Sequence, residues 1–170
     1  NLPGMVYRCR NEPGWPMEDV RGEVTELTGH TASELEANRT SWAELMHPDD
    51  REAVWEQVQA SLETSDSFEL TYRIDPADGE LRWVLERGRG VFGPDGDIVA
   101  IEGFVTDITE RRRRERERRR NERRFESMFN DPNILVGLLE TDGTVLDVND
   151  TALAYVDADR SDVVGASFSA

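Results

Sequence analysis

The chain has 170 residues, of which 37% are hydrophobic, and this supports one complete domain with a modest core and part of another. Its 36 acids against 20 basic residues give a net charge of −16, which disfavours nucleic-acid binding by the globular parts because phosphates require positive charge. No apolar run approaches the ~20 residues of a membrane span, we recognise no secretory signal, and Cys9 is the single cysteine, so we expect a cytoplasmic segment of a longer protein.

The first part of the chain predicts two short strands and then short helices. Residues 5–10 and 17–21 have the composition of strands on either side of a turn-rich loop. Two short helices follow, of which the first is stopped by Gly29 and the second is capped by Thr31 or Ser33.

A longer helix is predicted from Pro48 to about Leu62. Proline at the first helical position, with acids in the first turn, is a strong signal for a helix start. Within this segment Val54, Trp55 and Val58 form one apolar stripe with Leu62. We therefore expect one face of this helix to pack on a sheet.

Three strands follow at residues 68–74, 81–92 and 97–107, joined by turns that contain glycine. This order of elements predicts an α+β fold with an antiparallel sheet. In the middle strand the apolar pattern alone would send Trp83 and Leu85 inward. In the first and last strands the alternation sends inward Phe68, Leu70, Tyr72, Ile101, Gly103 and Val105.

The last strand runs without a turn into a charged helix. Asp107 can cap the first backbone N–H groups of this helix, and Glu110 can complete a capping box three residues later. A strand joined stiffly to a helix acts as a lever, because a disturbance of the sheet must move or loosen the helix. We therefore predict that Asp107, Ile108 and Thr109 relay a signal.

Residues 108–124 carry 10 Arg and 4 Glu, a charge of +6, between acidic segments of −14 (residues 1–107) and −8 (residues 125–170). A continuous helix over residues 108–129 would span ~33 Å. A heptad reading gives the seam Ile108, Arg111, Glu115, Arg118, Glu122, Phe125 and Phe129. Because only its ends are apolar, we predict a weak coiled coil. A nucleic-acid arm is disfavoured, because glutamates are interleaved with the arginines.

After this linker the chain starts again. Residues 131–136 resemble residues 2–7, and the motifs that follow recur at offsets of similar size, which indicates a tandem repeat. The second copy reaches Ala170 before its own long helix and strand meander, so it cannot bury a normal core alone. We divide the chain into a complete domain (1–107), a helical linker (108–124) and the first half of a second domain (125–170).

Five motifs in this order resemble the PAS family of sensor domains. They are Trp42 with His47-Pro48-Asp49-Asp50-Arg51, Tyr72-Arg73-Ile74, Asp78-Gly79 with Arg82-Trp83-Val84, Gly103, and Asp107-Ile108-Thr109-Glu110-Arg111. The resemblance covers residues 2–111, and residues 125–170 look like the opening half of a second PAS domain. It implies a five-stranded antiparallel sheet, with short helices and one longer helix over one face, enclosing a small-molecule cavity. It also implies a place in a histidine kinase, a transducer or a transcriptional regulator.

The resemblance reverses the assignment of the middle strand. It sends Val84, Glu86 and Gly88 inward and leaves Trp83 and Leu85 on the outer face, available to a dimer partner. The residues expected to line a ligand cavity are then Leu35, Trp42, Leu45, Val54, Val58, Phe68, Leu70, Tyr72, Val84, Ile101 and Val105. The competing interpretation is a filled core with no ligand.

The sequence requires no cofactor, although it is compatible with a noncovalent small ligand. We interpret His47 as a structural residue at a helix entrance, because neither His30 nor Cys9 stands at a metal-ligand spacing from it. Haem-binding relatives usually carry a histidine on the long helix, and residues 51–62 contain none. Light-sensing flavin relatives carry a cysteine motif that is absent here, so haem and flavin are both disfavoured and Cys9 is interpreted as a packing residue.

No catalytic constellation is present, so any enzyme activity is expected outside this segment. We predict a sensor module that binds a small molecule or a partner and forms a homodimer through the connector helix and the outer sheet face, without nucleic acid or membrane. The alternatives are a dimerisation or scaffold module and a haem or flavin redox sensor. The acidic, lysine-free composition resembles that of proteins from salt-loving archaea, in which molar salt screens repulsion to within ~3 Å.

Overall fold

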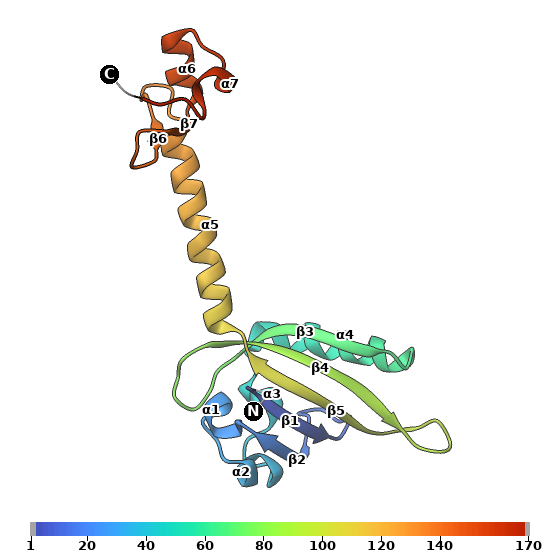
Figure 1. Cartoon of the computed structure of the whole chain (residues 1–170). Coiled ribbons are helices and arrows are strands. Elements are labelled where there is room, and N and C mark those ends of the chain that lie inside the picture. The colour runs from blue at the N-terminus through green and yellow to red at the C-terminus, as the bar shows by residue number, and fades with distance from the viewer. Residues whose placement is uncertain (1–2, 169–170) are drawn as a thin grey trace. The chain divides into compact units, whose positions relative to one another are not determined.

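The computed structural model describes residues 3–168, and the chain forms two compact units, Asn1–Arg113 and Arg114–Ala170. The first unit holds an antiparallel five-stranded sheet in the order β2-β1-β5-β4-β3 (Figure 1). Its strands are β1 (Met5–Cys9), β2 (Met17–Gly22), β3 (Ser67–Ile74), β4 (Arg82–Phe92) and β5 (Ile98–Asp107). This confirms the predicted fold class. The last strand, β5, lies at the centre of the sheet between β1 and β4, so the beginning and the end of the domain are hydrogen-bonded neighbours.

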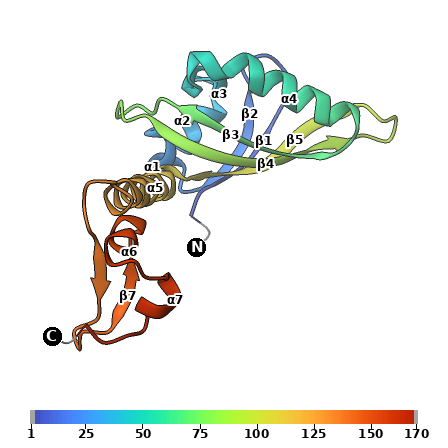
Figure 2. The ribbon, with the colours of Figure 1, turned by 90° about the horizontal axis from the view of Figure 1, so that it is seen from above.

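The helices of this unit gather over one face of the sheet (Figure 2). They are α1 (Val24–Thr28), α2 (Ala32–Glu36), α3 (Trp42–Leu45), the 3-10 turn η1 (Pro48–Asp50) and α4 (Arg51–Glu63). The cap of α2 is Thr31, which forms a capping box with Glu34, and Ser41 forms the same arrangement with Glu44 at the start of α3.

The helix predicted from Pro48 begins as the 3-10 turn η1 and becomes an α-helix only at Arg51. His47 stands at the entrance of this turn, where its Nδ1 accepts a hydrogen bond from the backbone N–H of Asp49 at 3.3 Å. The Asp50 carboxylate binds the guanidinium of Arg73 on β3, with Nη2 to Oδ1 at 2.6 Å, and Arg73 holds the pKa of Asp50 below its usual value. The turn therefore fastens the start of α4 to the edge strand.

The core lies between the sheet and the helices. Three members of the predicted stripe of α4, namely Val54, Val58 and Leu62, are buried, whereas Trp55 is half-buried and packs on Trp15 with ring centroids 4.8 Å apart. The inward residues predicted for β3, namely Phe68, Leu70 and Tyr72, are buried, and so are Ile101 and Val105 on β5, while Gly103 is half-buried.

In β4 the assignment taken from the family resemblance is confirmed, and the one taken from the apolar pattern is wrong. Val84 and Glu86 are buried, whereas Trp83 and Leu85 are half-buried on the other face. The apolar pattern failed because the inward positions of this strand include a carboxylate and a glycine, and the outer positions carry large apolar side chains.

The second unit contains most of α5 (Thr109–Phe129), a two-stranded hairpin of β6 (Gly137–Leu139) and β7 (Val145–Val148), and the short helices α6 (Asp150–Val156) and α7 (Arg160–Val163). The order strand, strand, helix, helix repeats that of β1, β2, α1 and α2. The hairpin and the two helices border an apolar hollow of about 440 Å³, and large apolar side chains such as Tyr155 and Phe168 are exposed on it.

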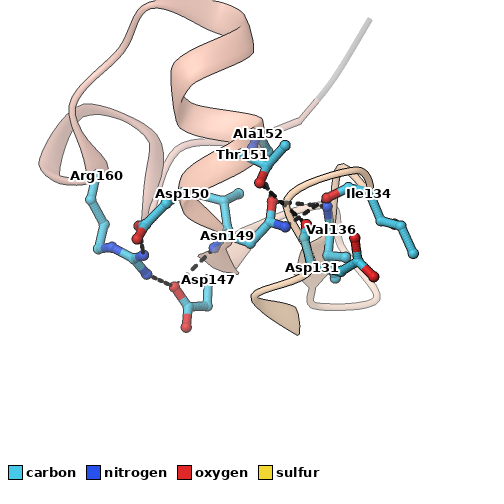
Figure 3. Close-up of polar contacts among 10 residues, drawn as sticks. Asp131, Ile134, Val136, Asp147, Asn149, Asp150, Thr151, Ala152 and Arg160 are labelled. Carbon is cyan, nitrogen blue, oxygen red and sulfur yellow. Dashed lines mark hydrogen bonds and ion pairs between the residues drawn. The ribbon is translucent and has the colours of Figure 1, made fainter. Parts of the chain in front are cut away.

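The polar centre of the second unit is Asn149, which is fully buried (Figure 3). Its Oδ1 accepts hydrogen bonds from the N–H groups of Val136 (3.0 Å) and Ala152 (2.9 Å), and its Nδ2 donates to the carbonyl of Ile134 at 2.7 Å. One amide side chain thus caps the N-terminus of α6 and holds the backbone that leads into β6. Because all three contacts are local and satisfied, we assign Asn149 a structural role.

Candidate functional site

The most unusual group in the core of the first unit is the carboxylate of Glu86, which is only 5% exposed. The hydroxyl of Tyr7 on β1 donates a hydrogen bond to Oε1, and the hydroxyl of Tyr72 on β3 donates to Oε2 at 2.5 Å. The indole N–H of Trp42 on α3 donates in turn to the Tyr72 hydroxyl at 2.9 Å. Three strands and one helix are therefore joined by a single buried polar network.

Two glycines make room for this network. Gly88 on β4 and Gly103 on β5 lie opposite each other in the sheet register. A Cβ atom at Gly103 would come within 2.7 Å of the Tyr7 hydroxyl oxygen and 2.6 Å of the Arg87 carbonyl oxygen, and one at Gly88 would come within 2.4 Å of the ring of Phe68. The absence of side chains at both positions lets the Tyr7 phenol reach Glu86.

Burial controls the protonation of the groups in this network. Burial raises the pKa of Glu86, and the hydrogen bonds from Tyr7 and Tyr72 oppose that rise in part. Burial, together with the negative charge of Glu86, raises the pKa of both tyrosines. Burial also raises the pKa of the Cys9 thiol, so Cys9 stays protonated and acts as a small packing residue, not as a nucleophile.

A raised pKa makes Glu86 a source of pH-dependent stability. The folded state holds the Glu86 proton more tightly than the unfolded state, so this stabilisation is complete below the unfolded pKa of ~4.3 and is lost as the pH rises through the folded pKa. We expect the wild type to lose stability relative to Glu86→Gln over that interval, as measured by urea unfolding at a series of pH values. A difference between the two proteins that is independent of pH would contradict this prediction.

Beside Glu86 lies a small internal cavity of about 10 Å³, which has room for about one water molecule. Its walls are Tyr7, Cys9, Trp15, Met17, Trp42, Met46, Val54, Val58, Phe68, Glu86 and Ile101.

Five of the eleven residues predicted to line a ligand cavity border this space, namely Trp42, Val54, Val58, Phe68 and Ile101. The other predicted residues are buried in the surrounding core without lining it: Leu35, Leu45, Leu70, Tyr72, Val84 and Val105.

Sequence reasoning did not select several residues of the cavity wall. Tyr7 and Cys9 come from β1, and Met17 from β2. The alternation of Met5, Tyr7 and Cys9 along β1 was the available signal, since all three are buried.

The junction between β5 and α5 is held by backbone hydrogen bonds to Trp83 of β4. The N–H of Ile108 donates to the Trp83 carbonyl at 2.8 Å, and the N–H of Trp83 donates to the Thr109 hydroxyl oxygen at 2.9 Å. Asp107 accepts a hydrogen bond from the N–H of Thr109 at 2.7 Å, so its side chain binds the first backbone N–H of α5. The three residues predicted as a relay thus bond directly to the neighbouring strand or to one another.

Arginine side chains strengthen this junction. The guanidinium of Arg112 in the first turn of α5 lies 3.9 Å from the centroid of the Trp83 ring, and that of Arg73 lies 5.8 Å from it. Arg82 donates to the carbonyls of Glu26 and Leu27 at the end of α1, and its Nε is 3.9 Å from Asp107 Oδ2. Part of the Trp83 surface that we expected to offer to a dimer partner is therefore occupied by arginines of the same chain.

Within residues 3–168, no three His, Cys, Asp or Glu side chains gather in a way that would hold a metal ion. Over the same residues, no helix combines the length and the apolar character needed to cross a bilayer.

Comparison with known proteins identifies the fold. Residues 18–105 match the family described as the PAS fold. The chain belongs to the PAS family. This PAS chain is 34% identical over 112 residues to the methyl sulfide methyltransferase-associated sensor of Methanosarcina acetivorans, an alignment that covers 65% of the chain and 11% of that protein. The curated relatives that it matches are much longer, since it covers 11% to 23% of their length.

Solved structures agree with this assignment. A sensory box histidine kinase/response regulator from Burkholderia thailandensis superimposes with a TM-score of 0.56 at 25% identity, over 72% of this chain and 90% of that one. The N-terminal domain of a diguanylate cyclase with PAS/PAC sensor from Marinobacter aquaeolei gives 0.54 at 23% identity, over 64% and 98%. The chain is therefore a PAS sensor module of the kind found in signal-transduction proteins such as histidine kinases.

Proposed function

We propose that the first PAS domain senses a small molecule or a partner at the cavity beside Glu86 and relays the change through Asp107, Ile108 and Thr109 to α5. The observation that carries this proposal is the bonding of Trp83, whose N–H and carbonyl both bind the first residues of the connector. Trp83 lies on β4, three residues from Glu86, so a shift of β4 in the core would act on both hydrogen bonds. The output activity of the whole protein would lie in other segments.

A modest coupling free energy between the cavity and α5 is enough for signalling. Allosteric coupling energies are typically ~1–3 kcal/mol, and one hydrogen bond contributes ~0.5–1.5 kcal/mol. Gain or loss of the two Trp83 hydrogen bonds is therefore of the right size to bias α5. A complete switch from 1:99 to 99:1 needs ~5.5 kcal/mol of differential ligand affinity.

Thr109→Val tests the relay. This change removes the acceptor of the Trp83 N–H but keeps the size of the side chain, and we expect it to cost about 1 kcal/mol locally. Amide hydrogen exchange in residues 110–113 should then become about fivefold faster. Thr71→Val, on the exposed face of β3, is the matched control and should leave that exchange unchanged. Equal exchange in wild type and Thr109→Val would remove the basis of the relay.

The ligand can be sought directly in the purified protein. Mass spectrometry of small molecules released on denaturation would reveal an occupant, and a visible absorption spectrum would reveal haem or flavin. A ligand that binds at the cavity should raise the unfolding temperature of the wild type and have a smaller effect on Glu86→Gln, because binding to the folded state stabilises it by mass action.

A second candidate function is a dimerisation or scaffold module with a filled core. The cavity volume of about 10 Å³ favours it, because a space for one water molecule does not accommodate an organic ligand without rearrangement. The discriminating result would be a protein that yields no small molecule on denaturation and still self-associates.

We further propose a homodimer through the predicted seam of α5 and the outer sheet face, in a cytoplasmic setting. Phe125 is half exposed on this seam and stacks on Phe129, which is buried within its own chain, with ring centroids 5.4 Å apart. The pairs Arg119–Glu115 (2.7 Å) and Arg118–Glu122 (3.6 Å) hold the charged middle of the helix in order. The buried, unpaired thiol of Cys9 suits a reducing compartment.

A further inference from the structure

The connector helix separates its charges onto different faces, although its sequence mixes them. At ~100° per residue, Arg116, Arg120 and Arg123 lie at i, i+4 and i+7 and share one face. This arginine face (Arg116, Arg120 and Arg123) borders one shallow surface hollow together with Arg119, Arg124 and Ser127. The glutamates of α5 fall on other faces, and the predicted coiled-coil seam lies on nearly the opposite side. The interleaved glutamates, which argue against a nucleic-acid arm, therefore lie beside the arginine face and not within it.

The side chains of the arginine face have nothing to bind in the described part of the chain. Arg118 and Arg119 pair with glutamates of their own helix, whereas Arg116, Arg120 and Arg123 are exposed and form no ion pair or hydrogen bond among residues 3–168. A row of three unpaired guanidinium groups on one straight helix favours an anionic partner of matching spacing.

A face with the opposite charge lies on α4. Val54, Val58 and Leu62 turn one side of this helix into the core, and Figure 2 shows the helix lying over the sheet with its other side outward. This acidic face consists of Glu52, Glu56 and Glu63, which are exposed and unpaired within the described residues.

The acids of the outer sheet face, in contrast, are already neutralised. Glu18 and Glu102 both pair with Arg8, and Glu69 pairs with Arg87. The acidic face of α4 is thus the row of carboxylates, on a regular helix, that remains available.

We propose that the arginine face of one copy docks on the acidic face of α4 in a second copy of the chain. Glu52 and Glu56 have the same i, i+4 spacing as Arg116 and Arg120, a rise of ~6 Å, so two Arg–carboxylate pairs can form at once. Each copy carries both faces, so each can supply either side of the contact, and the contact leaves the α5 seam free.

The same charges argue against a nucleic acid as the occupant. The segments on either side of the connector carry −14 (residues 1–107) and −8 (residues 125–170), and they would repel a polyanion that lay along α5. Two copies of this chain repel each other as well. At ~0.1 M salt, however, repulsion beyond ~10 Å is screened, whereas direct Arg–Glu contacts persist.

Charge-exchange variants of the whole 170-residue chain test the proposed contact. Sedimentation equilibrium at ~0.1 M salt should detect association that weakens about tenfold at ~1 M salt. The triple change Arg116→Glu, Arg120→Glu and Arg123→Glu should weaken association about tenfold, and so should Glu52→Arg, Glu56→Arg and Glu63→Arg. The two sets combined should restore it to within about threefold of the wild type.

The charge reversal on α4 (Glu52→Arg, Glu56→Arg and Glu63→Arg) is the decisive variant. It makes the net charge less negative, so general repulsion alone would predict stronger association, whereas the proposed contact predicts weaker association. The matched control is Glu80→Arg, Asp95→Arg and Glu140→Arg, which changes the net charge equally at exposed sites elsewhere and should not weaken association. Circular dichroism of each variant verifies that it is folded.

Three results would overturn the proposal. The first is a wild-type protein whose mass in sedimentation equilibrium, once a dimer through the α5 seam is accounted for, depends on neither salt nor protein concentration. The second is a reversal on α4 that leaves association unchanged or strengthens it. The third is a combined result. A short nucleic-acid duplex binds the wild type but not the triple Arg→Glu variant at positions 116, 120 and 123, and the charge reversal on α4 leaves the measured mass unchanged. That last result would make the arginine face a phosphate-binding surface.

Discussion

Tyr72→Phe should destabilise the PAS domain by about 2–4 kcal/mol, because it leaves two buried polar groups without a partner. The Tyr72 hydroxyl accepts from the indole N–H of Trp42 and donates to Glu86, and all three side chains are buried. Removing that one oxygen atom therefore leaves both an N–H donor and a carboxylate oxygen unsatisfied in the core. Few single-atom changes in this domain should cost more.

Urea unfolding followed by circular dichroism measures this loss. Tyr7→Phe removes a single hydrogen bond to Glu86 and should cost about half as much. Tyr155→Phe is the matched control, because Tyr155 is 77% exposed, and it should change the free energy of unfolding by less than about 0.5 kcal/mol. If Tyr72→Phe proved as mild as Tyr155→Phe, the buried network would not contribute to stability.

Gly103→Val should be the other severe change, with a cost of about 3 kcal/mol or more from overpacking. The Cβ atom would stand 2.6 Å from the carbonyl oxygen of Arg87 and 2.7 Å from the hydroxyl of Tyr7. The first neighbour is backbone of the adjacent strand and cannot move without breaking the ladder. The second could move only by leaving Glu86, so the change would damage both the sheet and the polar network.

Thermal unfolding of Gly103→Val and Gly103→Ala tests this steric argument, with the alanine variant intermediate. Gly137→Ala serves as the control, because a Cβ atom there meets nothing closer than 3.6 Å and no positive φ is required. Retention of wild-type stability by Gly103→Val would show that β5 can separate from β4 at little cost, which would also weaken the lever from sheet to α5.

The sheet and its helices were predictable because their signals are local. Alternation marked β3 and β5, glycine turns separated the strands of the meander, and Pro48 marked the entrance to α4. The observed bounds of these elements differ from the predicted ones by about one residue in most cases. The face of β4 was predictable only through the family resemblance, because Glu86 and Gly88 occupy inward positions that a hydrophobic pattern would assign to solvent.

The candidate site was harder to foresee because its contacts are not local. Glu86 meets Tyr7 across 79 positions of sequence, and Tyr72 across 14. The residues next to Glu86 in the sequence give no indication that two tyrosine hydroxyls will donate hydrogen bonds to its carboxylate. The separation of charge on the connector was not visible in the sequence for a related reason, since a linear sequence mixes residues that a helix places on separate faces.

The position of Trp83 gives the molecule a spectroscopic reporter of its own. Its indole is contacted by Arg112 at the start of α5 and by Arg73 on β3, and both of its backbone polar groups bind the connector. Incorporation of fluorotryptophan would give four fluorine resonances, one for each tryptophan, and Trp83→Phe would assign the relevant one. Detachment of the helix would remove a guanidinium group from the ring, so the chemical shift of that resonance would report the signalling state inside living cells.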